Sequence, residues 1–307
     1  MKAARETSRD KARHGAPGGF ETRGSEEAII RYYEAAGPDY EAWSKNFNMH
    51  FGFWRWPLNP FNRERMLEET TRQVFKRLRL SHTASETAVD LGCGLGASMR
   101  TGARFFPRLR LSGVTLVPWQ IERARVLTRD SGCENRLSYC HGNYESLPYA
   151  ANQFDACYAI ESAVYAQGAG KENLVQEAYR VLRSGGHFVI FDCFLKRPPE
   201  KMNPLVRYCY KQVCRGWAVE EMAQIEPFTN ALCVAGFTVV EREDISWQVA
   251  PSVAHAPFVT LRFFCGKLLL GERLSRESLH HLLSCALACL LGLDRRSFSY
   301  FLLTCRK

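Results

Sequence analysis

The sequence VDLGCGLG, residues 89–96, places three glycines directly after a short apolar run. The run Thr87–Leu91 predicts a buried strand, and the chain beyond Gly96 predicts a helix. Glycines at these positions let a ligand approach the backbone where the N-terminus of the helix presents unpaired amides. The stretch therefore predicts a strand, a loop and a helix that together hold a small ligand.

From Thr87 onward, short apolar runs alternate with longer segments of helical period. This alternation predicts an α/β fold with a parallel sheet that is covered on both faces. Pro118–Arg129 and Lys171–Arg183 read as helices, and Ser184-Gly185-Gly186 reads as a cap and turn after the second. The predicted strands are Thr87–Leu91, Leu109–Leu116, Arg136–Cys140, Phe154–Ile160, His187–Cys193, Thr238–Arg242 and Ser297–Cys305.

Composition divides the rest of the chain into segments. Residues 1–24 are polar, contain Pro-Gly-Gly and are expected to form a flexible tail, whereas residues 25–80 show helical patterns and are expected to form an N-terminal cap. The core is expected to comprise residues 81–195 and 228–307. Residues 196–227 are too long for a simple connection between strands, so they are expected to form an inserted helical lid.

The distribution of charge and the number of cysteines indicate which kind of partner and which cellular compartment to expect. The net charge of +9 is scattered and forms no basic stripe with interleaved aromatic residues, which argues against a nucleic-acid partner. The twelve cysteines lack a zinc-type pair of C-x-x-C motifs, so they read as buried free thiols in a reducing compartment. Because no secretory signal is visible and Leu279–Leu293 is short for a bilayer span, a soluble cytoplasmic protein is expected.

The spacing of the glycines distinguishes between two kinds of nucleotide loop. Dinucleotide-binding loops carry G-x-G-x-x-G, whereas this loop reads G-x-G-x-G, with Asp90 two residues ahead of its first glycine. In this it resembles the first motif of the class I methyltransferases that use S-adenosylmethionine. The resemblance implies a Rossmann-like, doubly wound sheet of seven strands with N-terminal helices and an inserted lid, and it implies S-adenosylmethionine as the cofactor.

Later segments resemble further motifs of the same family in the same order. Residues 113–120 resemble the second motif of the sterol, tocopherol and natural-product branch, in which Thr115 replaces the usual acidic residue and leaves the ribose to Gln120. Residues 142–148 resemble the adenine-side motif, with Asn143 in place of the usual aspartate; Asn143 could instead be a plain turn residue. The resemblance implies these cofactor contacts: Tyr33, Asp90, Gly92, Cys93, Gly94, Gly96, Thr115, Leu116, Gln120, Asn143, Tyr144 and Ile160.

An aromatic segment precedes the core. Residues 48–54 resemble the N-terminal signature of the same branch, whose helices fold over the cofactor, and Tyr33 matches a tyrosine that reaches it. Rings in this segment could line an apolar pocket and stabilise a developing cation, or they could simply pack in the core. Together with one carboxylate, the candidates for binding the acceptor are Phe47, Phe51, Trp54 and Asp192.

Glu161 is the leading catalytic candidate. It ends the fourth predicted strand, where ligands bind in such sheets, and it matches an acidic position of the sterol and isoprenoid C-methyltransferases. Val164 and Tyr165 stand where related sugar O-methyltransferases carry histidine bases, which argues against a copied O-methylation site. Tyr165 and His50 are further catalytic candidates, and the alternative for Glu161 is a hydrogen bond to cofactor or backbone.

The resemblance therefore implies an enzyme that methylates carbon in a lipophilic small molecule, such as an isoprenoid, a sterol-like compound or a secondary metabolite. Glu161 would act as base or cation stabiliser. The alternatives are O- or N-methylation of such a metabolite, nucleic-acid methylation, and a fold kept without transferase activity. No metal is expected, while peripheral membrane contact through Leu279–Leu293 and a homo-oligomer are further options.

Overall fold

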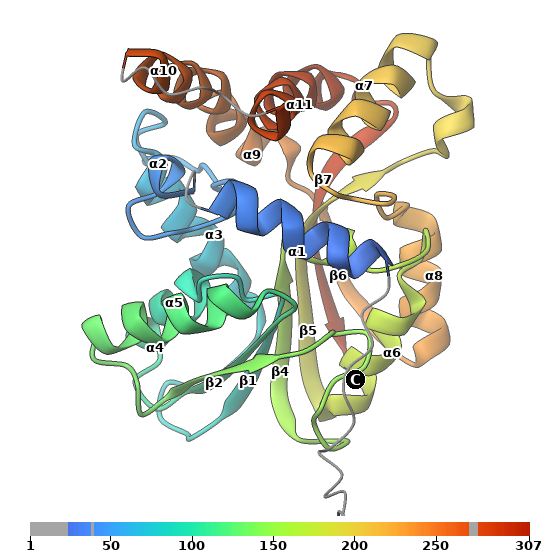
Figure 1. Ribbon diagram of the computed structural model, residues 1–307. Coiled ribbons are helices and arrows are strands. Elements are labelled where there is room, and N and C mark those ends of the chain that lie inside the picture. The colour runs from blue at the N-terminus through green and yellow to red at the C-terminus, as the bar shows by residue number, and fades with distance from the viewer. Residues whose placement is uncertain (1–23, 38–39, 270–275) are drawn as a thin grey trace, which may run out of the picture.

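A seven-stranded sheet forms the centre of the protein. The structure is a computed structural model and describes residues 24–37, 40–269 and 276–307, so the expected tail lies almost wholly outside the described residues. The strand order is β3-β2-β1-β4-β5-β7-β6, with β7 antiparallel to both neighbours (Figure 1). This confirms the expected Rossmann-like sheet. The strands are β1 Thr87–Leu91, β2 Arg110–Thr115, β3 Leu137–His141, β4 Phe154–Ile160, β5 Leu182–Leu195, β6 Thr238–Asp244 and β7 Phe298–Arg306.

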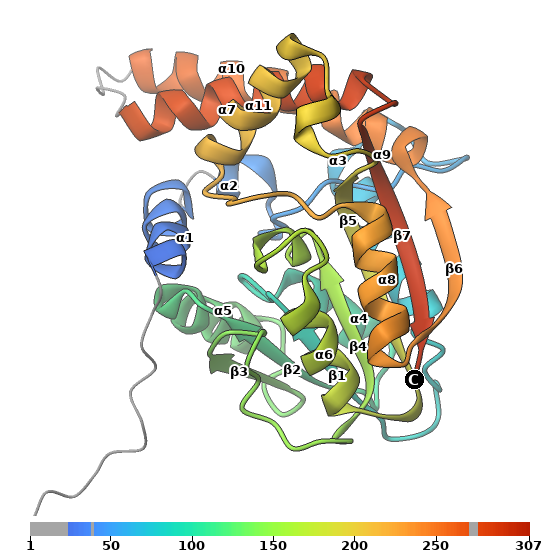
Figure 2. The ribbon, with the colours of Figure 1, turned by 90° about the vertical axis from the view of Figure 1, so that its right-hand side faces the viewer.

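Helices cover the two faces and the top of this sheet. α3, α4 and α5 pack on one face, and α6 and α8 on the other (Figure 2). α7, α9, α10 and α11 lie over the carboxyl end of the central strands (Figures 1 and 2). The helices are α1 Gly24–Ala36, α2 Tyr40–Trp43, α3 Arg63–Arg77, α4 Ala97–Phe105, α5 Pro118–Asp130, α6 Glu172–Val181, α7 Pro204–Gly216, α8 Ile225–Ala235, α9 Ser246–Val253, α10 Ala256–Leu269 and α11 Arg276–Leu293, with 3-10 turns at Ala163–Tyr165 and Pro199–Lys201.

The structure differs from the sequence-based elements directly after α6. The turn expected at residues 184–186 lies inside β5, which begins at Leu182. Gly185 adopts a φ of 83° there, and the pairing of β5 with β4 is irregular over this stretch, so the glycines form a kink within the strand. The expected lid 196–227 contains α7, and α9, α10 and α11 complete the layer of helices above the strands.

The strand order fixes where a ligand can bind. β1 pairs with β2 on one side and with β4 on the other. From β1 the chain builds the sheet outward through β2 and β3, and it then returns to β4 on the other side of β1, so the direction of the connections reverses between β1 and β4. A crevice therefore opens at the carboxyl ends of β1 and β4. The glycine loop follows β1 and Glu161 follows β4, so the topology brings the two features together.

Candidate active site

The glycine loop lines a cavity at the end of β1, here called the glycine-loop cavity, with about 750 Å³ of space including its mouth. Gly92, Gly94 and Gly96 have φ values of 93°, 52° and 72°, a region that side chains disfavour. A Cβ at Gly92 would lie 2.4 Å from Cβ of Ser162, so glycine is also required there for space. The loop thus brings backbone against the cavity, as expected for a bound nucleoside.

Asp90 lies at the bottom of this cavity and is 1% exposed. Ser98 donates its hydroxyl to Oδ2 of Asp90 at 2.6 Å. Burial raises the pKa of Asp90 to about 7, and no Lys or Arg in the described ranges forms an ion pair with it. A buried carboxylate without a cationic partner fits a ligand that carries positive charge, such as the methionine part of S-adenosylmethionine.

Thr115 and Gln120 form a second polar group of the glycine-loop cavity. The Thr115 hydroxyl donates to Oε1 of Gln120 at 2.7 Å and accepts the N–H of Val117 at 3.2 Å. Because the side-chain oxygen of Gln120 is thereby engaged, its amide nitrogen is the group that can donate to a ligand. A donor at this position suits the ribose oxygens that the sequence assigned to Gln120.

Two expected cofactor residues do not line the cavity. Asn143 donates to Oε1 of Glu26 at 2.7 Å and accepts the N–H of Glu145 at 2.7 Å, so both ends of its amide are engaged within the protein. It ties α1 to the core, and the expected adenine contact of Asn143 is not supported. Gly96 is the N-cap of α4, and a Cβ there would lie 2.3 Å from the Tyr139 hydroxyl oxygen, so this last glycine of the loop faces Tyr139. The other expected cofactor residues, Tyr33, Asp90, Gly92, Cys93, Gly94, Thr115, Leu116, Gln120, Tyr144 and Ile160, all line the cavity.

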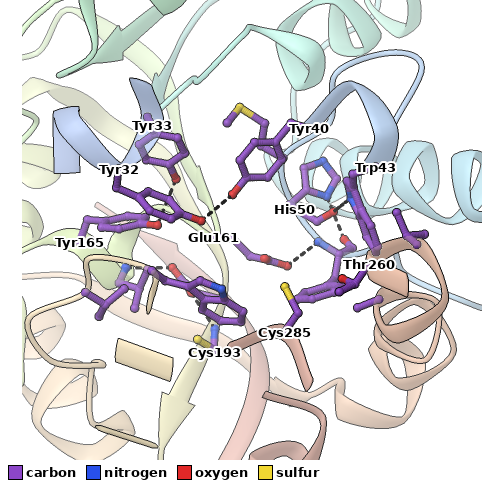
Figure 3. A pocket seen from close by; sticks show the side chains of 18 of the residues that line it. Tyr32, Tyr33, Tyr40, Trp43, His50, Glu161, Tyr165, Cys193, Thr260 and Cys285 are labelled. Atoms are coloured by element: carbon purple, nitrogen blue, oxygen red, sulfur yellow. Dashed lines mark hydrogen bonds between the residues drawn. The ribbon is translucent and has the colours of Figure 1, made fainter. Parts of the chain in front are cut away.

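A second cavity lies beside the first and holds about 1060 Å³ including its mouth. We call it the aromatic cavity, because rings from the cap, the sheet and the helices above it make up much of its wall (Figure 3). Phe51 and Asp192 line it as expected. Phe47 lines the glycine-loop cavity instead, and Trp54 lines neither, since its indole N–H donates to the Leu58 carbonyl at 2.8 Å.

The two cavities meet at a small group of shared residues, which we call the junction. These side chains line both cavities: Tyr33, Met49, His50, Glu161 and Tyr165. A methyl group that passes from a ligand in one cavity to a ligand in the other has to pass through this junction. All three expected catalytic residues therefore lie where the two ligands would meet, although they are far apart in sequence.

Glu161 occupies the centre of the junction (Figure 3). Its own N–H donates to the Phe191 carbonyl at 2.7 Å, and its φ of 49° turns the chain out of β4. Oε1 accepts the N–H of Phe51 at 2.8 Å. Burial raises the pKa of Glu161 well above its usual value, while the Phe51 N–H opposes the shift. A nearby cation would favour the ionised carboxylate.

Two tyrosine pairs flank Glu161 on one side (Figure 3). The Tyr33 hydroxyl donates to that of Tyr165 at 3.1 Å, and the hydroxyls of Tyr32 and Tyr40 lie 3.2 Å apart. Burial raises the pKa of Tyr33 to about 12, so its hydroxyl stays protonated at neutral pH. The pairs satisfy these hydroxyls while their rings face the cavity.

His50 and Asp192 complete the polar groups around Glu161. His50 Nδ1 lies 2.8 Å from the Phe51 carbonyl, and its buried Nε2 has no hydrogen-bond partner among the residues that the structure describes. Burial lowers the pKa of His50 to about 4, so the ring is neutral at pH 7 and Nε2 can accept a hydrogen bond.

Asp192 accepts the N–H groups of Cys193 and Val164 at 2.8 and 3.1 Å, so its carboxylate fixes the turn that carries Tyr165.

Lys171 supports the same turn from below and is fully buried. Its ammonium donates to the carbonyls of Ala166, Glu221 and Val164 at 2.6, 2.8 and 3.2 Å. It thereby joins the turn at residues 163–166 to the base of the lid. A single isolated lysine carried no signal for this role in the sequence.

Replacement of Lys171 by methionine should lower the free energy of unfolding by about 2–4 kcal/mol, because three buried carbonyls lose their donor. Urea denaturation followed by circular dichroism measures this loss. Lys76→Met, at an exposed position on α3, is the control and should leave stability within about 0.5 kcal/mol of wild type. Equal stability of the two variants would show that water replaces the Lys171 ammonium without cost.

Several residues of the aromatic cavity were not found by sequence reasoning. Ala256, Val259 and Phe263 recur at helical spacing on α10, a pattern that marks a buried face without saying what it faces. Of the two tyrosines before Glu34, Tyr33 was selected from the sequence and Tyr32 was missed. Among the other residues missed are Tyr40, Trp43, Met49, Trp217, Cys285 and Tyr300, of which Met49 lies at the junction.

Comparison with known proteins identifies the family of the domain that contains these cavities. A family model described as "Methyltransferase domain" matches residues 89–190, which include the glycine loop and Glu161. O-methyltransferase resE of Aspergillus sclerotiorum is 32% identical over 203 residues, which cover 66% of this chain and 73% of that protein. Sterol 24-C-methyltransferase of Kluyveromyces lactis is 26% identical over 53% of this chain, and the chain spans 43% of that protein's length.

Solved structures agree on the fold. Geranyl diphosphate C-methyltransferase of Streptomyces coelicolor A3(2), in complex with Mg²⁺, geranyl diphosphate and S-adenosyl-L-homocysteine, superposes with a TM-score of 0.68. The match covers 94% of this chain and 99% of that one at 17% identity, so it speaks for the fold alone. With the glycine loop, the sheet and a relative that is similar over most of its length, the chain belongs to the class I S-adenosylmethionine-dependent methyltransferases that act on small molecules.

Proposed function

We propose that the enzyme methylates a carbon atom of an uncharged, lipophilic small molecule such as an isoprenoid or sterol-like compound. The observation that carries this proposal is the junction, where a buried carboxylate, Glu161, stands between the glycine-loop cavity and a largely aromatic cavity. The name of the sterol 24-C-methyltransferase relative agrees with a lipophilic acceptor.

The chain offers a complete set of groups for the cofactor. The glycine loop and Gln120 would hold the nucleoside, and Asp90 would face the amino-acid part. When bound, S-adenosylmethionine supplies a methyl group on a positively charged sulfur. Tyr33, Met49 and Tyr165 line both cavities and would keep water from the space between this methyl group and the acceptor.

The acceptor side suits a reaction that creates positive charge on carbon. When an alkene takes the methyl group, a carbon–carbon bond forms from the double bond, the methyl–sulfur bond breaks and the neighbouring carbon becomes cationic. Rings such as Phe51, Trp43 and Tyr300 would stabilise that charge by about 0.5–2 kcal/mol for each well-placed contact. Glu161 would then take the proton whose loss restores a double bond.

The charge of the aromatic cavity favours an uncharged acceptor. Glu161 and Asp192 line it, whereas no Lys or Arg does so among the residues that the structure describes. A diphosphate that enters without a metal ion would therefore meet two carboxylates without a compensating cation.

This charge pattern gives a direct test with a set of acceptors. Incubation with methyl-labelled cofactor and sterols, neutral isoprenoid alkenes, quinols, phenols and prenyl diphosphates, followed by mass spectrometry, should give C-methylated products of the neutral compounds. Prenyl diphosphates should react at least about 100-fold more slowly, because burying an unpaired charge costs several kcal/mol. Efficient methylation of a diphosphate, or label found only on oxygen or nitrogen, would contradict the proposal.

O- or N-methylation of a similar metabolite is the second candidate, favoured by one observation. His50 Nε2 lies at the junction as an acceptor without a partner, so it could receive the hydrogen of an acceptor hydroxyl or amine. The O-methyltransferase name of the Aspergillus relative agrees with this alternative. The pKa of His50 is about 4, so this side chain is a weak base at neutral pH. For this reason O- or N-methylation is the second candidate.

A further inference from the structure

The helices above the aromatic cavity expose several large apolar side chains. Among the side chains that the structure describes, the exposed large hydrophobic ones lie on these helices or on the loop at residues 55–61, apart from Val234 and Val240. They are Trp56, Phe61, Leu205, Tyr208, Trp247, Phe258, Leu261, Leu283, Leu290 and Leu293.

α10 carries large apolar side chains on both of its faces. Ala256, Val259 and Phe263 line the aromatic cavity, whereas Phe258 and Leu261, on the other side of the helix, are 73% and 60% exposed. A helix that covers a cavity in water normally carries polar residues on its outer face, and one that is apolar all round is normally buried. Exposed phenylalanine and leucine on the outer face of α10 therefore suit contact with another apolar surface.

α11 continues this surface, since it packs against both α10 and α7 (Figure 2). Leu283, Ala286, Leu290 and Leu293 are exposed and follow one another at helical spacing, so they form one apolar stripe. None of the helices in the described ranges is long and apolar enough to cross a bilayer. The stripe is suited to lying on a surface.

Basic residues flank the stripe on the lid. Residues 196–216 contain six Lys or Arg residues and one Glu. On α7, Leu205 and Tyr208 are exposed on the same side as Lys211 and Arg215, and exposed Arg262 adds a cation on α10. Apolar side chains with cations beside them match a bilayer surface with anionic headgroups, into which amphipathic helices insert their apolar side.

We propose that α7, α10 and α11 dock on the surface of an anionic lipid bilayer. A second copy of this chain fits less well, because a symmetric pairing of this face would bring its cations against one another. Docking places the roof of the aromatic cavity against the lipids, from which an acceptor could enter. That consequence rests on the proposed function, whereas docking itself is measured without any acceptor.

Vesicle co-sedimentation of the full chain tests the proposal. The bound fraction should be at least about tenfold higher on vesicles of equal parts phosphatidylglycerol and phosphatidylcholine than on phosphatidylcholine alone, and it should fall with salt. The pair Leu290→Glu/Leu293→Glu should reduce binding about tenfold or more. Lys211→Glu/Arg215→Glu should remove the preference for anionic vesicles.

Val234→Glu/Val240→Glu is the matched control, because these exposed valines lie on α8 and β6 away from the lid. This pair should bind vesicles as wild type does. Equal loss in both glutamate pairs, or no binding by wild type, overturns the proposal. Light scattering without vesicles tests whether a second copy of the chain covers this surface instead. If the wild type is a dimer that Leu290→Glu/Leu293→Glu dissociates, and it binds no vesicles, the surface is a dimer interface and the proposal is overturned.

Two readouts keep the test independent of misfolding and of the acceptor. The affinity for S-adenosylhomocysteine should be unchanged in every variant, since none of the substituted residues lines the glycine-loop cavity. In wild type, hydrogen exchange within residues 283–293 should slow at least about threefold when anionic vesicles are added. Unchanged exchange overturns the docking of α11, and inactivity toward neutral lipophiles with intact docking would refute only the proposed function.

Discussion

Replacement of Glu161 by glutamine should reduce turnover by about 10²–10⁴-fold and leave the affinity for S-adenosylhomocysteine within about threefold of wild type. Glutamine is isosteric and can still accept the N–H of Phe51 through its side-chain oxygen, so the cap stays attached. It cannot hold a negative charge beside a cationic carbon or take its proton. Single-turnover rates with labelled cofactor, together with calorimetric binding, measure the two quantities separately.

Glu122→Gln provides the control for this variant, because Glu122 is 74% exposed on α5 and should be replaceable without effect. A second comparison addresses the competing chemistry. If Glu161→Gln keeps its turnover while His50→Gln loses it, the reaction proceeds through the histidine and the O- or N-methylation candidate replaces the first. Loss of cofactor affinity in Glu161→Gln would make Glu161 a binding residue.

Asp90→Asn should weaken the binding of S-adenosylmethionine by about 10–100-fold, because a buried carboxylate that faces a cation contributes roughly 1.5–3 kcal/mol. The same group predicts a pH dependence in wild type. Its pKa is about 7 without ligand, and a bound cation favours the ionised form, so affinity should fall as the pH drops below 7. Isothermal titration calorimetry at pH 6, 7 and 8 measures this trend.

The asparagine variant should lose most of this pH dependence, which distinguishes a charge effect from a change of shape. Asparagine retains an oxygen that can accept the Ser98 hydroxyl, so the loop should keep its conformation. Asp130→Asn, at an exposed position at the end of α5, should match wild type in affinity and in pH profile. An unchanged affinity in Asp90→Asn would mean that the cationic part of the cofactor lies elsewhere.

The sheet and the glycine-loop cavity were predictable because their signals are local. A strand followed by closely spaced glycines and a helix defines its own geometry, and the alternation of apolar runs fixes the order of the remaining elements. Glu161 was found for the same reason, since it directly follows a recognisable strand. Its place between two cavities follows from the strand order, which places β4 beside β1.

The predictions that did not hold depended on partners distant in sequence. Asn143 donates to Glu26, which lies 117 residues away in the sequence, and the residues next to Asn143 give no indication of this hydrogen bond. Trp54 and Phe53 belong to one aromatic run with Phe51, and sequence alone could not tell which ring faces a cavity. Phe263 and Trp217 reach the aromatic cavity only because the helices above the sheet pack over it.

The hydrogen bond between the Phe51 N–H and Glu161 has a consequence for the timing of the catalytic cycle. A carboxylate accepts a hydrogen bond more strongly than a carboxylic acid does. If Glu161 takes a proton from the product, its hold on the N-terminal cap weakens at that moment. The cap would therefore be held most firmly before methyl transfer and most weakly after it. Completion of the reaction would itself loosen the cap and allow the product to leave.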